Sequence, residues 1–341
     1  TQFDVYGDGV YMADSPLGPY EYAPNNPVCY KPGGFANGTG HGSTMQGPYG
    51  NFWHFGTMAV SVNQIWERRI VMYPTYFDED GLMHTNTSFG DYPHYAPDNF
   101  FNAGAFTGWM LLSYKKSVQA SSSLQGRGPQ NIVDENVKTF WVAEKNNDEQ
   151  WLEIDLENPA KVHALQINYN DYQSDIYGRV PALYHRYTIE GSMDGKHWKL
   201  LVNKKDSYED APNDYVELDQ PQTVRYIRYQ HVSGPTTHLS ISDLRVFGTG
   251  QGNLPPTVEG LTASRGRDRR NATISWEAIN NAQGYNVRWG IAPDKLYSSW
   301  LVYGKNHLEL RSLNVEQNYY FTVEAFNENG VSERATLVRS E

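Results

Sequence analysis

With 341 residues, of which 14% are aromatic, the chain is long enough for two or three domains with separate cores. Its formal net charge of −11 at pH 7, with the expectation of no Lys/Arg-rich block, argues against nucleic acid as a partner, because nucleic-acid binding needs clustered positive charge to displace counterions. No apolar stretch approaches the roughly 20 residues that cross a bilayer, so we predict no membrane span.

Strand-like runs dominate the chain, and two linker-like stretches divide it. Apolar and polar residues alternate at 151–156 and 319–325, as in β-strands, and no convincing long amphipathic helix is present. The stretch 113–123 is rich in Ser and Lys, and the stretch 248–256 is rich in Gly and Pro. We therefore predict an all-β protein with domains at 1–112, 113–250 and 254–341.

The first segment begins at Thr1 without an initiator Met or a signal peptide, so we expect a mature chain or a fragment of a longer protein. A strand-and-turn motif runs from Tyr6 to Tyr20, and Gly-His-Gly-Ser stands at 40–43. Further blocks follow at 50–55, 69–74 and 77–82. In these blocks the segment resembles the end of the five-bladed propeller of glycoside hydrolase family 43.

This resemblance implies partial β-propeller blades of an inverting hydrolase for arabinose-, xylose- or galactose-containing glycans. The family's catalytic carboxylates would all precede Thr1, so we expect no catalytic residue here and no activity from the chain alone. The resemblance makes His41 a candidate residue of the propeller channel, in contact with an ion or water held there, although a lone histidine is usually structural. It also places Arg69 near the substrate pocket. A missing N-terminal part or a second chain would complete the propeller.

The second segment carries a distinctive run from Asn131 to Trp141, a strand-like run at 151–156 and a closing run at 242–248. With the runs at 187–198 and 224–229, this order resembles the F5/8 type C (discoidin) family, which shares a jelly-roll β-sandwich with family 32 carbohydrate-binding modules. The resemblance implies a structural Ca²⁺ bound by hard oxygen ligands. The ligands would be the side chains of Asp134, Thr139 and Asp243, with backbone oxygens near Ile132 and Asn136.

Two departures from the family pattern affect this calcium site. Glu135 replaces the usual Gly, and Asp243 stands where a longer Glu is typical. The alternative interpretation is that Asp134 and Thr139 only cap a turn.

Sugars bind this family on loops at one end of the sandwich, where an aromatic side chain is flanked by Arg, His or Asn. The insert from Asn168 to Tyr184 could instead pack against the neighbouring propeller. The candidate sugar-binding residues are Tyr172, Tyr177, Arg179, Tyr184, His185 and His238.

The third segment resembles a fibronectin type III domain, with Trp276 in an early core strand and Leu313 and Tyr319 in a tyrosine-corner arrangement. An immunoglobulin-like β-sandwich with a spacer or docking role is implied, and we assign it no site.

Together these features predict the C-terminal portion of a secreted glycoside hydrolase, extracellular or periplasmic, whose partners are plant-type or other polysaccharides. The alternative is a non-catalytic carbohydrate-binding or adhesion protein, which the missing carboxylates favour. A start inside a propeller blade counts against that alternative, because a partial propeller leaves unpaired strand edges.

Overall fold

The computed structural model describes residues 6–36, 38–59, 68–95, 106–174, 176 and 181–340. These residues form β-strands, turns and loops with one short 3-10 helix, η2 (Pro129–Val133), which confirms the all-β fold class. None of the helical structure in this part of the chain is long and apolar enough to cross a membrane. The chain forms two compact units: unit 1 combines residues up to 60, 67–108 and 254–341, and unit 2 contains Trp109–Asn253.

The first part of unit 1 contains a four-stranded antiparallel sheet in sequential order. Along its third strand the side chains alternate, so that Val71, Tyr73 and Thr75 are buried while Ile70 and Met72 are exposed. Sheets of four antiparallel strands are the building blocks of propeller blades, but the family 43 propeller itself stays a prediction. The strands are β5 (Gly40–Gln46), β6 (Phe52–Ala59), β7 (Arg68–Phe77) and β8 (Met83–Thr85), and two smaller pairs are β1 (Gly7–Asp8) with β4 (Cys29–Tyr30) and β2 (Tyr11–Met12) with β3 (Glu21–Tyr22).

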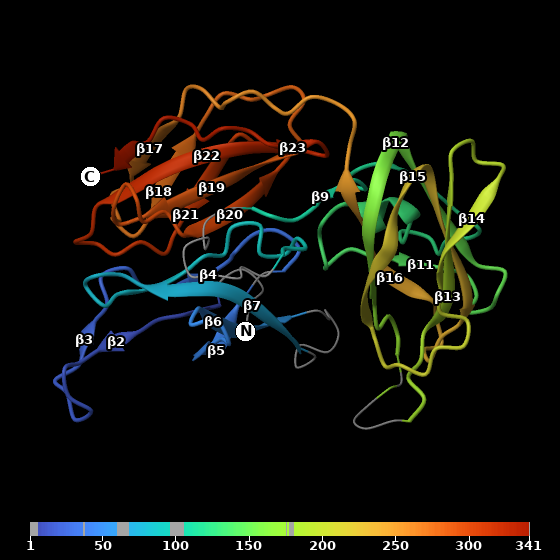
Figure 1. Cartoon of the computed structure of the whole chain (residues 1–341), viewed down its shortest axis with the longest axis horizontal. Helices are drawn as coiled ribbons and strands as arrows, with labels where there is room; N and C mark the ends of the chain where they lie inside the picture. The colour runs from blue at the N-terminus through green and yellow to red at the C-terminus, as the bar shows by residue number, and fades with distance from the viewer. Residues whose placement is uncertain are drawn as a thin grey trace. The chain divides into compact units, whose positions relative to one another are not determined.

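The last part of unit 1 is a two-sheet β-sandwich, drawn in orange and red in Figure 1. Its core includes Ile274, Trp276 and Val287, and the hydroxyl of Tyr319 accepts a hydrogen bond of 3.0 Å from the backbone N–H of Asn314. One sheet contains β17 (Thr262–Arg265), β18 (Ala272–Ser275) and β21 (His307–Leu310). The other sheet contains β20 (Ser298–Tyr303), β19 (Gly284–Gly290), β22 (Tyr319–Asn327), β23 (Gly330–Val331) and β24 (Val338–Ser340).

The central strands β19 and β22 of this five-stranded sheet are buried on both faces, because the first part of unit 1 covers their outer face. In β19 the residues from Gly284 to Trp289 are all buried. In a strand with one face in solvent, buried and exposed residues would alternate. The ring of Phe326 lies 5.3 Å from that of Phe89, and the hydroxyls of Tyr92 and Tyr303 are 2.8 Å apart. We call this contact the seam, formed by Thr87, Ser88, Phe89 and Tyr92 against Asn286, Ser299, Tyr303 and Phe326.

Unit 2 is built around two long antiparallel strands, β12 (Trp151–Tyr169) and β15 (Asn213–Ser233), which pair along their length. Early in its course β12 also pairs with β10, and later it pairs with β16, within one eight-stranded sheet of order β11-β16-β12-β15-β13-β14 (Figure 1). The core of the unit includes Ile154, Val162 and Ile227. The other strands are β9 (Met110–Leu111), β10 (Ser117–Ala120), β11 (Trp141–Val142), β13 (Arg186–Ser192), β14 (Trp198–Asn203) and β16 (Ser240–Thr249).

Candidate functional site

The predicted calcium turn begins where η2 ends, at Asp134. The two carboxylate oxygens of Asp134 accept hydrogen bonds from the backbone N–H of Asn136 (3.0 Å) and from the hydroxyl of Thr139 (2.7 Å). The same hydroxyl lies 2.8 Å from the carbonyl oxygen of Asn136. Burial raises the pKa of Asp134. The turn therefore gathers carboxylate, hydroxyl and carbonyl oxygens, while Ile132 is a fully buried residue of η2.

Glu135, the residue that departs from the family's Gly, has a φ of 58°, in the left-handed region that favours glycine. Its carboxylate accepts two hydrogen bonds from Arg245, at 2.8 and 2.9 Å, and both side chains are buried. Arg245 also donates to the amide oxygen of Gln166 at 2.9 Å. This ion pair joins the turn to β16. Glu135 therefore keeps the left-handed backbone conformation that the family's glycine would adopt.

Asp243 lies on β16 next to this pair and is completely buried. No side chain in the described part of the chain donates a hydrogen bond to its carboxylate, and the backbone N–H of Glu135 is the donor nearby. Burial raises the pKa of Asp243 well above its usual value; the negative charges of Glu135 and Asp134 add to the shift, while the positive charge of Arg245 and the backbone of Glu135 oppose it. A buried carboxylate with so few donors is costly unless a cation or a proton balances it.

Asn168, which the sequence did not indicate, pairs with Asp243 across the β12–β16 ladder. Its side chain is 2% exposed, and neither its amide oxygen nor its amide nitrogen has a hydrogen-bond partner among the described residues. The register of two neighbouring strands therefore places a buried amide beside a buried carboxylate. A polar residue at a core-facing strand position was the available signal.

The donor set determines which cation these residues could hold. The described residues contain no cluster of three or more His, Cys, Asp or Glu side chains of metal-binding geometry. A cation here would depend on the carboxylates of Asp134 and Asp243 together with hydroxyl, amide and backbone oxygens. Such hard oxygen ligands fit Ca²⁺.

A second group, the loop cluster, consists of Arg127, Phe140, Tyr172 and His238, which come from four different loops of unit 2. The guanidinium of Arg127 lies 4.0 Å from the ring centre of Phe140 and 5.6 Å from that of Tyr172. The rings of Tyr172 and His238 meet edge to face at 5.5 Å. Within the described chain, no residue accepts a hydrogen bond from the side chain of Arg127 or pairs with the ring nitrogens of His238.

Tyr184 belongs to a separate aromatic group. Its ring meets that of Tyr208 edge to face at 5.5 Å, and Arg186 lies 4.9 Å from the ring centre of Tyr208. Arg186 already donates a hydrogen bond to the carbonyl oxygen of Ser207 at 3.1 Å. The candidates Tyr177 and Arg179 lie outside the described residues.

His185 points into unit 2 and is buried, so it is not presented to a ligand in solution. Its ring stacks on that of Tyr169 at 3.5 Å. Burial lowers the pKa of His185 to about 3, and the nearby His231 contributes to the shift. His231 is fully buried, with its two ring nitrogens 2.9 Å from the hydroxyl of Tyr229 and 2.7 Å from the amide oxygen of Asn146.

In unit 1, the predicted channel residue His41 is exposed and has a φ of 58°. It lies in a β-bulge, because the register between β5 and β6 shifts between Gly40 and Ser43. Bulges re-aim side chains and occur often beside functional sites. Arg69 lies on β7, with β6 between it and the strand of His41, and its guanidinium donates to the carbonyl oxygen of Arg68 at 3.2 Å.

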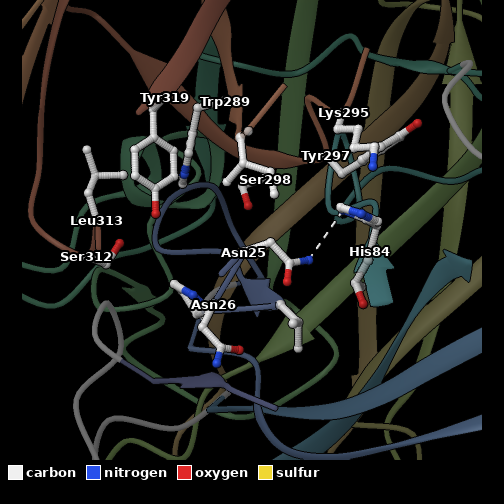
Figure 2. A pocket seen from close by; sticks show the side chains of 15 residues that line it. Asn25, Asn26, His84, Trp289, Lys295, Tyr297, Ser298, Ser312, Leu313 and Tyr319 are labelled. Atoms are coloured by element: carbon white, nitrogen blue, oxygen red, sulfur yellow. Dashed lines mark hydrogen bonds between the residues drawn. The ribbon is translucent and has the colours of Figure 1, made fainter. Parts of the chain in front are cut away.

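Unit 1 also contains a small pocket beside the seam, shown in Figure 2. Asn25 and His84 approach at 3.4 Å, and His84 also contacts the carboxylate of Asp78 at 2.8 Å. Lys295 binds the same carboxylate, and these partners hold the pKa of Asp78 at about 2 despite burial that would raise it. Because its charged groups are already paired, we assign this pocket no ligand.

Comparison with known proteins identifies one part of the chain. Residues 117–243 match the family model of the F5/8 type C domain, so this segment of unit 2 is an F5/8 type C domain, as predicted. No curated protein matches the chain.

Several solved structures are similar to the chain at low identity. Chitosan-binding module 1 of a chitosanase/glucanase from Paenibacillus sp. IK-5 is 23% identical, over 41% of this chain and 99% of that chain, with a TM-score of 0.34. The family 32 module of C. perfringens NanJ, solved with galactose, is 18% identical, over 40% of this chain and 97% of that chain, with a TM-score of 0.33. A structure described as a glycoside hydrolase is 20% identical, over 70% of this chain and 53% of that chain, with a TM-score of 0.36.

Proposed function

We propose that unit 2 is a carbohydrate-binding domain that holds a sugar on the loop cluster. The observation that supports this most strongly is the combination of aromatic rings with unused hydrogen-bond donors in an F5/8 type C domain. The side chains of Arg127 and His238 make no hydrogen bonds to other described residues, although Phe140 and Tyr172 hold them in place through ring contacts.

The proposed binding mode follows from the chemistry of these side chains. The apolar C–H face of a pyranose or furanose ring packs on Tyr172, while the guanidinium of Arg127 donates to adjacent hydroxyls. The imidazole of His238 can donate or accept a further hydrogen bond. With one stacking contact and few hydrogen bonds we expect weak binding, roughly 0.1–1 mM, or about −4 to −5.5 kcal/mol.

Titration of the full chain with galactose-, arabinose- and xylose-containing oligosaccharides tests this proposal. Calorimetry or NMR should show saturable binding, and Tyr172→Ala or Arg127→Gln should raise Kd at least tenfold. Tyr208→Ala, in the separate group with Tyr184, is the matched control and should leave Kd unchanged. Loss of binding in Tyr208→Ala alone would move the site to that group, and no binding to any sugar would refute the function.

We further propose that Asp134, Thr139, Asn168 and Asp243, with backbone oxygens near Ile132 and Asn136, hold a structural Ca²⁺. The buried oxygens of Asp243 and Asn168, to which no described side chain donates a hydrogen bond, support this proposal. The cation would supply the positive charge that the buried carboxylates lack, and it would fix the turn that leads to Phe140.

For the whole protein we propose a secreted, family 43-like glycoside hydrolase of which this chain is the C-terminal portion. The sequence motifs of the first segment, the four-stranded sheet β5 to β8 and the bulge at His41 support it. An assay of the isolated chain on aryl arabinofuranosides and xylosides should show no turnover above buffer. Turnover abolished by His41→Ala would contradict the proposal that catalytic residues lie outside this chain.

A further inference from the structure

A concentrated basic patch lies on the third segment, in a protein that is otherwise acidic. The turn between β17 and β18 carries four arginines within residues 265–270, and Arg311 follows β21, the strand that pairs with β18. The only carboxylates of this turn and of the adjoining residues 311–318 are Asp268 and Glu316. We name the patch the arginine turn: Arg265, Arg267, Arg269, Arg270 and Arg311.

The arginine turn is held in place by hydrogen bonds of its own. The backbone N–H of Gly266 donates to the carbonyl oxygen of Asn271 at 2.9 Å, which closes the turn. The backbone N–H of Leu313 donates to the carbonyl oxygen of Arg270 at 3.1 Å and joins the turn to residues 311–318. Arg265 lies beneath and donates to the carbonyl oxygens of Asn314 and Gln317, each at 3.0 Å. An ordered turn loses little conformational entropy when it binds a ligand.

Arginines elsewhere in the chain commonly pair with carboxylates, and those of the arginine turn mostly do not. Arg225, Arg228 and Arg245 pair with Asp155, Glu153 and Glu135 at 2.7–2.8 Å. In the arginine turn only Arg270 has such a partner, Asp268, at 2.9 Å.

The remaining guanidiniums of the turn keep donors for a ligand. Arg269 donates only a long hydrogen bond of 3.4 Å to the carbonyl oxygen of Val315, and Arg267 and Arg311 have no ion pair in the described chain. Burial lowers the pKa of Arg265, and the positive charge of Arg269 adds to the shift, so like charges already crowd one another. An anion bound here would relieve this repulsion.

We propose that the arginine turn binds negatively charged glycans through their carboxylate or sulfate groups. The inference extends the proposed carbohydrate function and depends on it, because it specifies charged polysaccharide as a ligand class. Planar guanidiniums match carboxylate and sulfate oxygens with two parallel hydrogen bonds each. A long nucleic acid is disfavoured, because the chain's net charge of −11 repels a polyanion beyond this small patch.

Binding of oligogalacturonate to the full chain tests the proposal, with a neutral galacto-oligosaccharide of the same length as reference. We expect the Kd for oligogalacturonate to rise with sodium chloride concentration, and the variant Arg267→Gln/Arg269→Gln/Arg311→Gln to raise it at least tenfold. The control variant Lys196→Gln/Lys205→Gln/Lys305→Gln removes the same three charges from exposed sites elsewhere and should stay within twofold of the wild type. The neutral oligosaccharide should bind both variants equally.

Unchanged oligogalacturonate binding in the arginine variant would overturn the proposal. Tighter binding of duplex DNA or of phosphatidylserine vesicles through the same arginines would show that the ligand class is wrong. If the neutral oligosaccharide fails to bind while oligogalacturonate binding still depends on the arginines, the loop-cluster function fails and the arginine turn stands.

Discussion

At the scale of single residues, Asp243 is a buried carboxylate with few partners. No side chain donates a hydrogen bond to it in the described part of the chain, two other carboxylates lie nearby, and the hydrogen bonds of Arg245 go to Glu135 and Gln166. A carboxylate in this position is either protonated or balanced by a cation.

If Ca²⁺ supplies that balance, the metal stabilises unit 2, because a ligand that binds only the folded state raises its stability. EDTA should lower the Tm of the unit 2 transition, and added calcium should restore it. Asp243→Asn should remove the calcium response, whereas Asp194→Asn, in an exposed turn, should retain it. A transition that EDTA does not move would argue for a protonated Asp243 without a metal.

His185 and His231 predict acid sensitivity of unit 2. Burial is the main cause that lowers their pKa values, to about 3 and about 4. Below the unfolded pKa of about 6.5 only the unfolded chain takes up protons, so each histidine costs about 1.4 kcal/mol of stability per pH unit. The loss should begin as pH falls below 6.5 and continue until the folded pKa values are reached.

Urea unfolding between pH 8 and pH 4.5, followed by a unit 2 probe, measures this slope. His185→Phe should flatten it by the contribution of one histidine. A ring resonance of His185 that titrates near pH 6.5 in the folded protein would disprove the burial argument.

At the scale of elements, the bulge in β5 shows why a glycine stands beside His41. A Cβ on Gly42 would overlap the ring of His54 and the carboxylate of Asp8, which are joined by a hydrogen bond of 2.9 Å. The bulge thus lets β5 pass closely over a pair that links β1 to β6, and it turns His41 outward.

Gly42→Ala should therefore destabilise unit 1 by about 1–3 kcal/mol, the usual cost of overpacking. Thermal unfolding compared with Gly128→Ala measures the effect, because a Cβ on Gly128 meets nothing within 4 Å. Equal Tm values for the two variants would mean that β5 can move away from Asp8 and His54 without cost.

The strands and turns of unit 2 were the most predictable elements. The run at 131–141 and the alternating run at 151–156 led to the F5/8 type C domain, which the family match confirms. The sequence could not predict how Glu135 replaces glycine, because its partner Arg245 is distant in sequence and only the folded sheet brings the two together. The position of Asn168 beside Asp243 could not be predicted either, because the two residues are distant in sequence and meet only in the folded sheet. The expectation of no Lys/Arg-rich block was wrong, because residues 265–270 contain four arginines.

At the scale of the whole molecule, the seam joins the two ends of the chain in unit 1. Phe326 lies at its centre, fully buried, with the rings of Phe89 and Tyr303 at 5.3 and 5.6 Å. No local pattern predicts such a contact, because each segment read alone shows only strands and turns.

Phe326→Ala should destabilise the first and last parts of unit 1 together, by about 3–5 kcal/mol. Hydrogen exchange should then accelerate in residues 83–92 as well as in β19 and β22, and unit 2 should remain protected. Faster exchange confined to residues 254–340 would show that the last segment unfolds independently of the first.

The seam also determines the order in which the parts of the protein can fold during translation. The first segment emerges early, but the strands that cover it are encoded after all of unit 2. At about 5–20 residues per second, roughly 10–40 seconds pass before those strands are made. Unit 2 can fold during this interval, while Phe89 and Tyr92 still lack the strands of the last segment that pack against them. A nascent chain halted before residue 254 should therefore engage chaperones, and release of the completed chain should end that engagement.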